Sequence, residues 1–336
     1  NVDKILQGES ELPLGVSDAM REVLQFLALK KDTSVQYHPT PITVAEATSG
    51  WKGCKERTSS ASRSGSNTHF GHWKAGYQDD TIAQFHTDMA NVPYLSGYSP
   101  SRWQFGIDVI LLKKQGNYNI NRLRTILLYE ADFNMMNKQV GRLMMQYGEK
   151  HGVLSPEQYG SRKNRTAIEC ALNKRLLFDI MRQIKKSAGI CSCDLEGCYD
   201  KILHNFASLA MQRCGAPKSA IESMFTTIQQ LKHVVRTAFG DSDSSFGGEF
   251  WREILRLHGV GQGNGAGPAI WAVISSVIFD YIRNKGYGAK ISAPLSKLAF
   301  HLAGCGFVDD TDLMQTGNEG DDYVTVSSKL QEAIDL

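Results

Sequence analysis

The stretch GFVDDTDLM, residues 306–314, places two adjacent aspartates and a third one shortly after them behind an apolar approach, LAFHLAGCG. Like charges this close repel each other unless a cation or a feature of the fold compensates them. The flanking segments KLAFHLAGCGFV and TDLMQTG predict two arms of a β-hairpin with Asp309 and Asp310 at its tip. Because hard divalent cations bind carboxylate oxygens, the tip is a candidate metal site.

The bulk composition is that of an ordinary globular protein. The 336 residues are 42% hydrophobic and 21% charged, which suits about two domains and excludes wholesale disorder. The longest apolar run, GPAIWAVISSVIF at 267–279, is too short to span a bilayer. The first residues, NVDKILQGESELPLG, lack the pattern of a signal peptide. We therefore expect no membrane span and a piece of a longer intracellular chain.

Two further features concern charge and thiols. Residues 102–186 carry 16 basic and 7 acidic side chains, whereas 187–336 carry 12 and 17. A basic middle beside an acidic end is typical of a polyanion-binding surface next to a carboxylate site, although solvated helix faces give similar counts. The seven cysteines form no CxxC pair, which favours reduced thiols over zinc ligands.

Hydrophobic periodicity predicts the main elements. Helices are expected over 17–31, 81–90, 130–149 and 165–185, followed by two more after residue 200 and another from Pro268. Strands are expected in FGIDVILLKKQGN at 105–117, which also turns, in GICSCDL, which ends on Asp194, and in HVVRTAF at 233–239. Residues 58–76, rich in Ser and Gly, are expected to form a loop.

Three of these features stand in a fixed order: Asp194 at the end of a buried strand, the Gly-rich turn GVGQGNGAGP at 259–268, and the Asp309-Asp310 pair. Each alone is commonly structural, since an aspartate at a strand end often forms a turn or caps a helix. Together they suit a two-metal site, in which ions about 3.5 to 4 Å apart clamp the attacking and leaving oxygens of a phosphoryl transfer.

From Trp103 to Met314 the sequence resembles a reverse transcriptase, specifically the enzymes of non-LTR retrotransposons and group II intron-type elements. Six segments match the motifs of that family in order: VILLKKQGN, RLRTILLYEADFNMMNK, QYGSRKNRTAIEC, CDLEGCYDKI, GVGQGNGAGP and FVDD. The resemblance implies a mixed α/β (α+β) fold with fingers and a palm, the palm being an antiparallel ferredoxin-like sheet with helices on one face. It implies a helical N-terminal extension over 1–101, fingers over 102–186, and a palm over 187–336 that stops before the thumb.

The resemblance also implies the catalytic residues. Asp194 and Asp309 would bind two Mg²⁺ ions, or Mn²⁺ in their place, with Asp310 beside them. The returning-strand Asp312 is expected to be structural. Ions held there would activate the primer 3′-hydroxyl and neutralise the triphosphate.

Substrate contacts follow from the same comparison. Lys114 would contact the phosphates of the incoming nucleotide, with Lys113 as the alternative. Arg124 would pack on its base and contact phosphate, with Arg122 as the alternative, because a planar guanidinium suits both contacts. Tyr199 would exclude a ribose 2′-hydroxyl.

Gln262 and Gly263 match the family's Gln-Gly turn under the nascent base pair. Here the chain departs from the pattern, since Gly261 replaces the usual proline and NGAG follows in place of Ser-Pro-Leu-Ser. These glycines predict a more mobile turn. A milder departure is Thr125, which replaces a proline of the fingers.

The expected partners are an RNA template, a DNA primer and deoxynucleoside triphosphates, in the nucleus or the cytoplasm. Two alternatives stay open. A retroelement relic would bind RNA without catalysis, as the altered Gly-rich turn allows. An RNA-dependent RNA polymerase would read the ribose through Asp200.

Overall fold

The computed structural model describes residues 2–6, 9, 15–29, 40–62, 66–195, 197–248, 258–293, 295 and 298–336. The chain forms two compact units, each assembled from segments that are far apart in sequence. Unit 1 comprises residues 1–36, 147–198 and 268–336, and unit 2 comprises 37–146 and 199–267.

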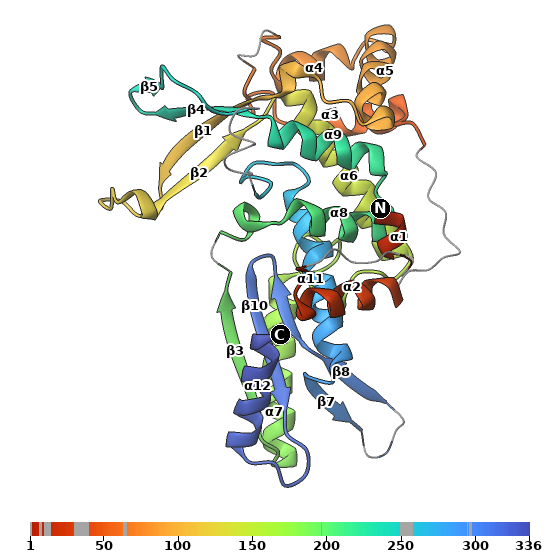
Figure 1. The fold of residues 1–336 in the computed structure, drawn as a ribbon, viewed down its shortest axis with the longest axis vertical. Helices are drawn as coiled ribbons and strands as arrows, with labels where there is room; N and C mark the ends of the chain where they lie inside the picture. Colours follow the sequence, from red (N-terminus) through yellow and green to blue (C-terminus); the bar gives the residue numbers. More distant parts are fainter. Residues whose placement is uncertain are drawn as a thin grey trace. The chain divides into compact units, whose positions relative to one another are not determined.

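Unit 1 is built around a small antiparallel sheet. Its elements are α1 (Val2–Leu6), α2 (Asp18–Leu29), α7 (Ala167–Ile184), β3 (Ala188–Asp194), α11 (Gly267–Asn284, whose first residue belongs to unit 2), β7 (Ala289–Ser292), β8 (Ala299–Leu302), β9 (Gly304–Phe307), β10 (Asp310–Thr316) and α12 (Tyr323–Asp335). The strand order is β3-β10-β9, so β10 is paired on both sides (Figure 1). The central strand therefore leads directly out of the predicted hairpin tip.

Helices cover both faces of this sheet, whereas the resemblance predicted helices on one face. On one face Leu177 and Met181 of α7 pack with Met314 of β10. On the other, α11 and α12 pack against Leu313, the residue of β10 that precedes Met314. Because successive side chains of a strand point to opposite faces, one apolar strand such as β10 can support helices on both sides.

The approach to the hairpin tip is divided into two strands, not one arm as predicted. β8 pairs with β7 in a separate two-stranded ribbon, and only β9 pairs with β10. The chain changes partners at Ala303, whose N–H donates to Glu157 Oε1 at 3.0 Å and whose carbonyl accepts from Met314 at 2.9 Å. A buried carboxylate distant in sequence therefore ends β8.

Unit 2 contains a second sheet. Its elements are α3 (Val44–Lys52), α4 (Phe70–Gly76), α5 (Asp80–Ser96), η1 (Ser101–Trp103), β1 (Phe105–Leu112), η2 (Ile120–Arg122), β2 (Leu123–Leu128), α8 (His204–Arg213), α9 (Lys218–Gln229), β4 (Lys232–Thr237), β5 (Gly240–Asp241) and β6 (Phe246–Gly247). Two elements continue from one unit into the other, α6 (Ala131–Lys150) and η3 (Cys198–Lys201). The strand order is β2-β1-β4-β5, with β6 also on β4 and with β1 parallel to β4. β1 and β2 form the predicted long hairpin (Figure 1).

The prediction of a loop over 58–76 is wrong for its last seven residues, which form α4. The buried rings of Phe70 and Trp73 lie 5.7 and 5.6 Å from the ring of Trp51 on α3. His69 precedes the helix, and its N–H donates to Nδ1 of His72. Aromatic packing thus stabilises a helix within a stretch whose Ser and Gly content predicted a loop.

Within the part of the chain that the structure describes, no helix is long and apolar enough to cross a membrane. The seven cysteines all lie in described segments and are free thiols.

Candidate active site

Strand register brings two of the predicted carboxylates together. Asp310, the first residue of β10, pairs directly with Asp194, the last residue of β3. Directly opposed residues of an antiparallel pair project on the same face of the sheet, with Cβ atoms about 5 Å apart. Asp309 lies in the adjoining turn, and all three side chains are exposed. Three carboxylates are therefore presented at one corner of the sheet.

The turn that carries Asp309 has an unusual backbone. Phe307 pairs with Asp310, so Val308 and Asp309 are the two turn residues. Val308 has φ of 59°, in the left-handed region that a β-branched residue rarely adopts. Such a conformation costs about 1 to 3 kcal/mol and persists only where surrounding contacts impose it.

Those contacts hold both backbone polar groups of Val308. Its N–H donates to Oε1 of Gln158 at 3.3 Å, and its carbonyl accepts a hydrogen bond from Nε1 of Trp271 on α11. Gln158 is 1% exposed and is itself fixed, because its Nε2 donates to Ser275 at 2.8 Å. Gly160 lies so close that a Cβ there would stand 2.3 Å from the Val308 nitrogen. The hairpin tip is therefore held by a clamp of Gln158, Gly160 and Trp271.

The clamp is joined to the sheet through the backbone. Tyr159 N–H donates to Gly306 at 2.8 Å, and Gly306 N–H donates to Glu157 at 2.8 Å, so 157–159 runs beside β9. Arg162 supports this segment by donating to the carbonyls of Ser155 and Gln158. The QYG motif thus acts as an added edge of the sheet that positions the turn.

Asp312, which the sequence predicted to be structural, makes side-chain contacts within the fold. It accepts from the Lys174 ammonium on α7 and from the Ser192 hydroxyl on β3. The hydrogen bond to Asp312 raises the pKa of Lys174. The contacts of Asp312 therefore join α7 to both strands below the exposed carboxylates.

No group of three or more His, Cys, Asp or Glu side chains comes together to hold a metal ion among the described residues. Asp194 and Asp310 nevertheless offer facing carboxylates, the oxygen donors that Mg²⁺ prefers. The donor chemistry fits a divalent cation. Asp309 would have to join Asp194 and Asp310 around such an ion.

The predicted phosphate-contacting residues lie together in unit 2. Arg124 pairs across the hairpin with Leu111, and Lys114 lies in the turn just beyond β1. The alternatives Lys113 and Arg122 lie beside them, and all four side chains are exposed. None of the four forms an ion pair with a described residue, so the tip of this hairpin carries four available cations.

The other predicted substrate residues meet at the Gly-rich turn. The N–H of Val260 donates to the Tyr199 carbonyl at 2.9 Å, which ties the turn to η3. Leu127 of β2 donates its N–H to the Gln262 carbonyl at 2.8 Å. Gly263 approaches the same residue so closely that a Cβ would lie 2.2 Å from the Leu127 carbonyl oxygen. Tyr199, Gln262 and Gly263 thus lie around one contact between the turn and β2.

Glycine serves close packing in this turn, where the sequence predicted mobility. Gly261 has φ of 67°, and a Cβ there would stand 2.8 Å from the Tyr129 hydroxyl. That hydroxyl donates to the Val260 carbonyl at 2.6 Å. Gly265 N–H donates to Oδ1 of Asn134 at 2.6 Å. Its hydrogen bonds and close approaches tie the turn to β2 and α6.

Asp200, the residue behind the RNA-polymerase alternative, lies beside this turn. Desolvation raises the pKa of its carboxyl, and a hydrogen bond with the Gln262 side chain opposes the shift. Gly259 packs on the Asp200 backbone, where a Cβ would stand 2.6 Å away. Asp200 thus contacts the Gly-rich turn through Gln262 and Gly259. These contacts are structural and do not depend on a catalytic role for Asp200.

The structure therefore gathers the predicted site residues in two sets, the carboxylates in unit 1 and the substrate residues in unit 2. The clamp residues Gln158, Gly160 and Trp271 were not predicted as site residues from the sequence. The QYG segment was recognisable as a motif, but nothing in the sequence indicated that Val308 would need support. No local pattern marked Trp271 either, since it lies in an apolar helix.

The sequence model of the family "Reverse transcriptase (RNA-dependent DNA polymerase)" matches residues 112–334, more than half of the chain. The chain belongs to the reverse transcriptase family. Among curated proteins, none matches it. The matched segment begins at the end of β1 and ends in α12, so it contains all of the predicted site residues.

Proposed function

We propose that this chain is an RNA-directed DNA polymerase that uses two divalent ions, Mg²⁺ or Mn²⁺, held by Asp194, Asp309 and Asp310. The observation that supports this most is the register of β3 and β10, which sets Asp310 opposite Asp194 beside a turn whose backbone is clamped. A clamped turn favours catalysis because the carboxylates are positioned before substrate binds.

When bound, the ions would acidify the primer 3′-hydroxyl and neutralise the triphosphate. Lys114 and Arg124, at the exposed tip of the β1–β2 hairpin, would bind the phosphates of the incoming nucleotide. Tyr199 would exclude a ribose 2′-hydroxyl, and Gln262 with Gly263 would support the new base pair. With an RNA template, a DNA primer and deoxynucleotides as its partners, the proposed activity would take place inside the cell, in the nucleus or the cytoplasm.

Primer extension by the full chain tests the proposal. We expect Mg²⁺-dependent extension of a DNA primer on an RNA template with deoxynucleotides. Asp194→Asn and Asp309→Asn should each lower the rate by about a thousandfold or more, because each removes a charged ligand of the ions. Asp243→Asn removes an exposed carboxylate elsewhere and should leave the rate unchanged.

Other outcomes would favour the alternatives. Incorporation of ribonucleotides alone would overturn the proposal and favour an RNA polymerase, in which Asp200 reads the ribose. Retained RNA binding without any extension would favour a relic. Tyr199→Ala tests the sugar assignment separately: we expect ribonucleotide use to rise at least about tenfold, and an unchanged preference would contradict that role.

A further inference from the structure

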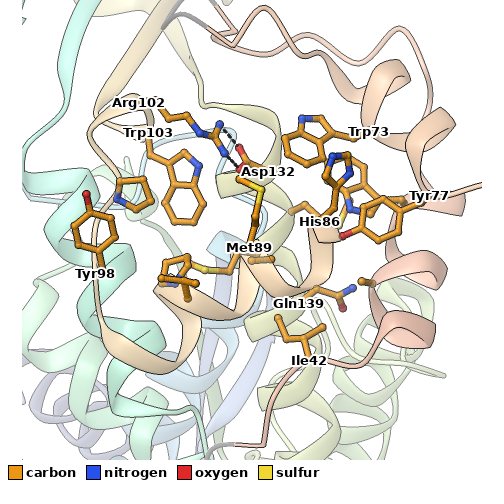
Figure 2. A pocket seen from close by; sticks show the side chains of 18 residues that line it. Ile42, Trp73, Tyr77, His86, Met89, Tyr98, Arg102, Trp103, Asp132 and Gln139 are labelled. Atoms are coloured by element: carbon orange, nitrogen blue, oxygen red, sulfur yellow. Dashed lines mark hydrogen bonds and ion pairs between the residues drawn. The ribbon is translucent and has the colours of Figure 1, made fainter. Parts of the chain in front are cut away.

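Unit 2 holds a cavity of about 240 Å³ that the polymerase proposal does not use. Its walls combine aromatic and aliphatic side chains and come mainly from α3, α4, α5 and η1, with α6 closing one side (Figure 2). Trp73, His86 and Trp103 stand around the space, and Met89 lies between them. Most of the lining precedes residue 112, where the family match begins.

One polar group in the wall has no partner. Trp103 is 2% exposed, and its Nε1–H makes no hydrogen bond to any described residue. Figure 2 shows the Trp103 indole turned toward the space on the side of Asp132. Asp132 itself is engaged, because both of its oxygens accept from the Arg102 guanidinium. A buried donor left unpaired is costly, so an occupant with an acceptor at this point would be favoured.

The cavity adjoins an exposed apolar stripe along α5. Ile82, Phe85, Met89 and Val92 follow helical spacing and are between 44% and 61% exposed. Met89 and Val92 also line the cavity, so stripe and cavity form one continuous surface. A continuous apolar stripe beside a cavity with aromatic side chains in its wall is typical of a groove that receives an amphipathic helix.

The charge of this surface indicates which partner it suits. α5 has Asp80 and Asp88 but no Lys or Arg, and Asp79 caps its start. All three carboxylates are exposed. Nucleic acids bind where lysine and arginine neutralise phosphates, so this face disfavours them. A partner with basic side chains would be attracted.

We propose that this surface binds a basic amphipathic helix of a partner protein, which lies along α5 and inserts a tyrosine ring into the cavity. Tyrosine fits the wall because its hydroxyl oxygen can accept from Trp103 Nε1, whereas phenylalanine has no acceptor and tryptophan only donates. Its ring also matches the aromatic lining, since aromatic pairs gain from edge and offset contacts.

Synthetic helices of about 18 residues, long enough to follow α5, provide the test. One peptide carries a central tyrosine flanked by leucines, with lysines on the other face, and a second differs only by phenylalanine at the centre. Binding to the full chain is measured by titration calorimetry. Trp103→Phe keeps an aromatic wall and removes the donor, and Asp88→Lys reverses a charge beside the stripe.

We expect the tyrosine peptide to bind about tenfold more tightly than the phenylalanine peptide, with the difference lost in Trp103→Phe. Asp88→Lys should weaken both peptides. Equal affinity of the two peptides for the unaltered chain would overturn the proposal. A preference for single-stranded RNA at this surface, lost in Trp103→Phe, would also overturn it, as would burial of the stripe by self-association. If Trp103→Phe fails to fold, the affinities of the unaltered chain for p-cresol and for toluene, which correspond to the side chains of tyrosine and phenylalanine, are compared instead. Equal affinities would again overturn the proposal.

Discussion

Two turns of this protein fix their backbones in opposite ways. The turn at Val308 keeps a branched side chain in the left-handed region and is held by hydrogen bonds to both of its backbone groups. The turn at 259–267 instead removes side chains, so that glycines can approach β2 and α6 closely. The first depends on its neighbours to impose a strained shape, and the second depends on the absence of Cβ atoms. Adding a side chain in the glycine turn should therefore lower the free energy of unfolding, whereas removing the side chain of Val308 should raise it.

The largest effect is expected at Gly263. Gly263→Ala should lower the free energy of unfolding by about 3 kcal/mol or more, because its Cβ would collide with the Leu127 carbonyl at a φ of 140°. Urea denaturation measures the loss. Gly116→Ala is the matched control, with φ of 83° and open space around it, and should cost about 1 kcal/mol. Equal losses would show that close approach is not what the glycine provides.

Gly160 tests the clamp from outside the turn. Gly160→Ala should cost about 2 kcal/mol and lower primer extension at least about tenfold, because its Cβ would push the Val308 nitrogen away. Denaturation and single-turnover rates measure the two effects. Gly189→Ala in β3, where a Cβ meets only ordinary contacts at 3.5 Å, should leave the rate unchanged. A normal rate in Gly160→Ala would mean that the position of the turn does not limit synthesis.

Val308→Gly should change the free energy of unfolding in the opposite direction from the two glycine substitutions. Relief of the strained φ should raise the free energy of unfolding by about 1 kcal/mol, after allowance for the greater freedom of glycine in the unfolded chain. Val324→Gly, at an exposed site in the first turn of α12, should instead lower it by a similar amount. Parallel thermal and urea denaturation compares the pair. A loss at both positions would rule out stored strain at Val308.

The smallest change in stability is expected from a change of pH. Groups near the two turns should respond in different pH ranges. Burial lowers the pKa of His204, whose Nε2 lies 2.6 Å from the Gly259 carbonyl. The unfolded chain therefore binds a proton first, and stability is lost as the pH falls below about 6.5. His204→Gln should reduce that loss in urea denaturation between about pH 7.5 and about pH 5.5.

The turn at Val308 should respond only in more acidic solution. The hydrogen bond with Arg162 lowers the pKa of Glu149. The contribution of this pair to the free energy of unfolding is therefore present above the ordinary pKa of about 4.5 and is lost as the pH falls. Arg162 supports the segment that holds the clamp. Glu149→Gln should therefore leave stability near pH 6 with its usual pH dependence. An altered dependence near pH 6 would contradict the separation of the two ranges.

Local sequence patterns predicted most helices and strands because their periodicity is strong. α6 and α7 lie within a few residues of their expected limits, and α11 begins one residue before the expected Pro268. The failures came from contacts between distant segments. α4 depends on Trp51, and the division between β8 and β9 depends on Glu157. Neither contact has a signature in the neighbouring residues.

The candidate site shows the same limit. Motif order located Asp194 and the Asp309-Asp310 pair, and hydrophobic flanks predicted the hairpin that carries them. The strand register, which sets Asp310 rather than Asp309 opposite Asp194, required the structure. So did the support of Val308, because nothing about a valine in sequence indicates a left-handed backbone.

The strand order of unit 1 also has a consequence for biosynthesis. β3 ends at residue 194, but β10, the strand that pairs with it among the described residues, begins at residue 310. At ribosomal rates of about 5 to 20 residues per second, about 6 to 23 seconds pass between the synthesis of the end of β3 and that of the start of β10. The unpaired backbone groups of β3 are open to other chains or to chaperones during this interval. The yield of folded protein should therefore depend on translation speed between the two strands.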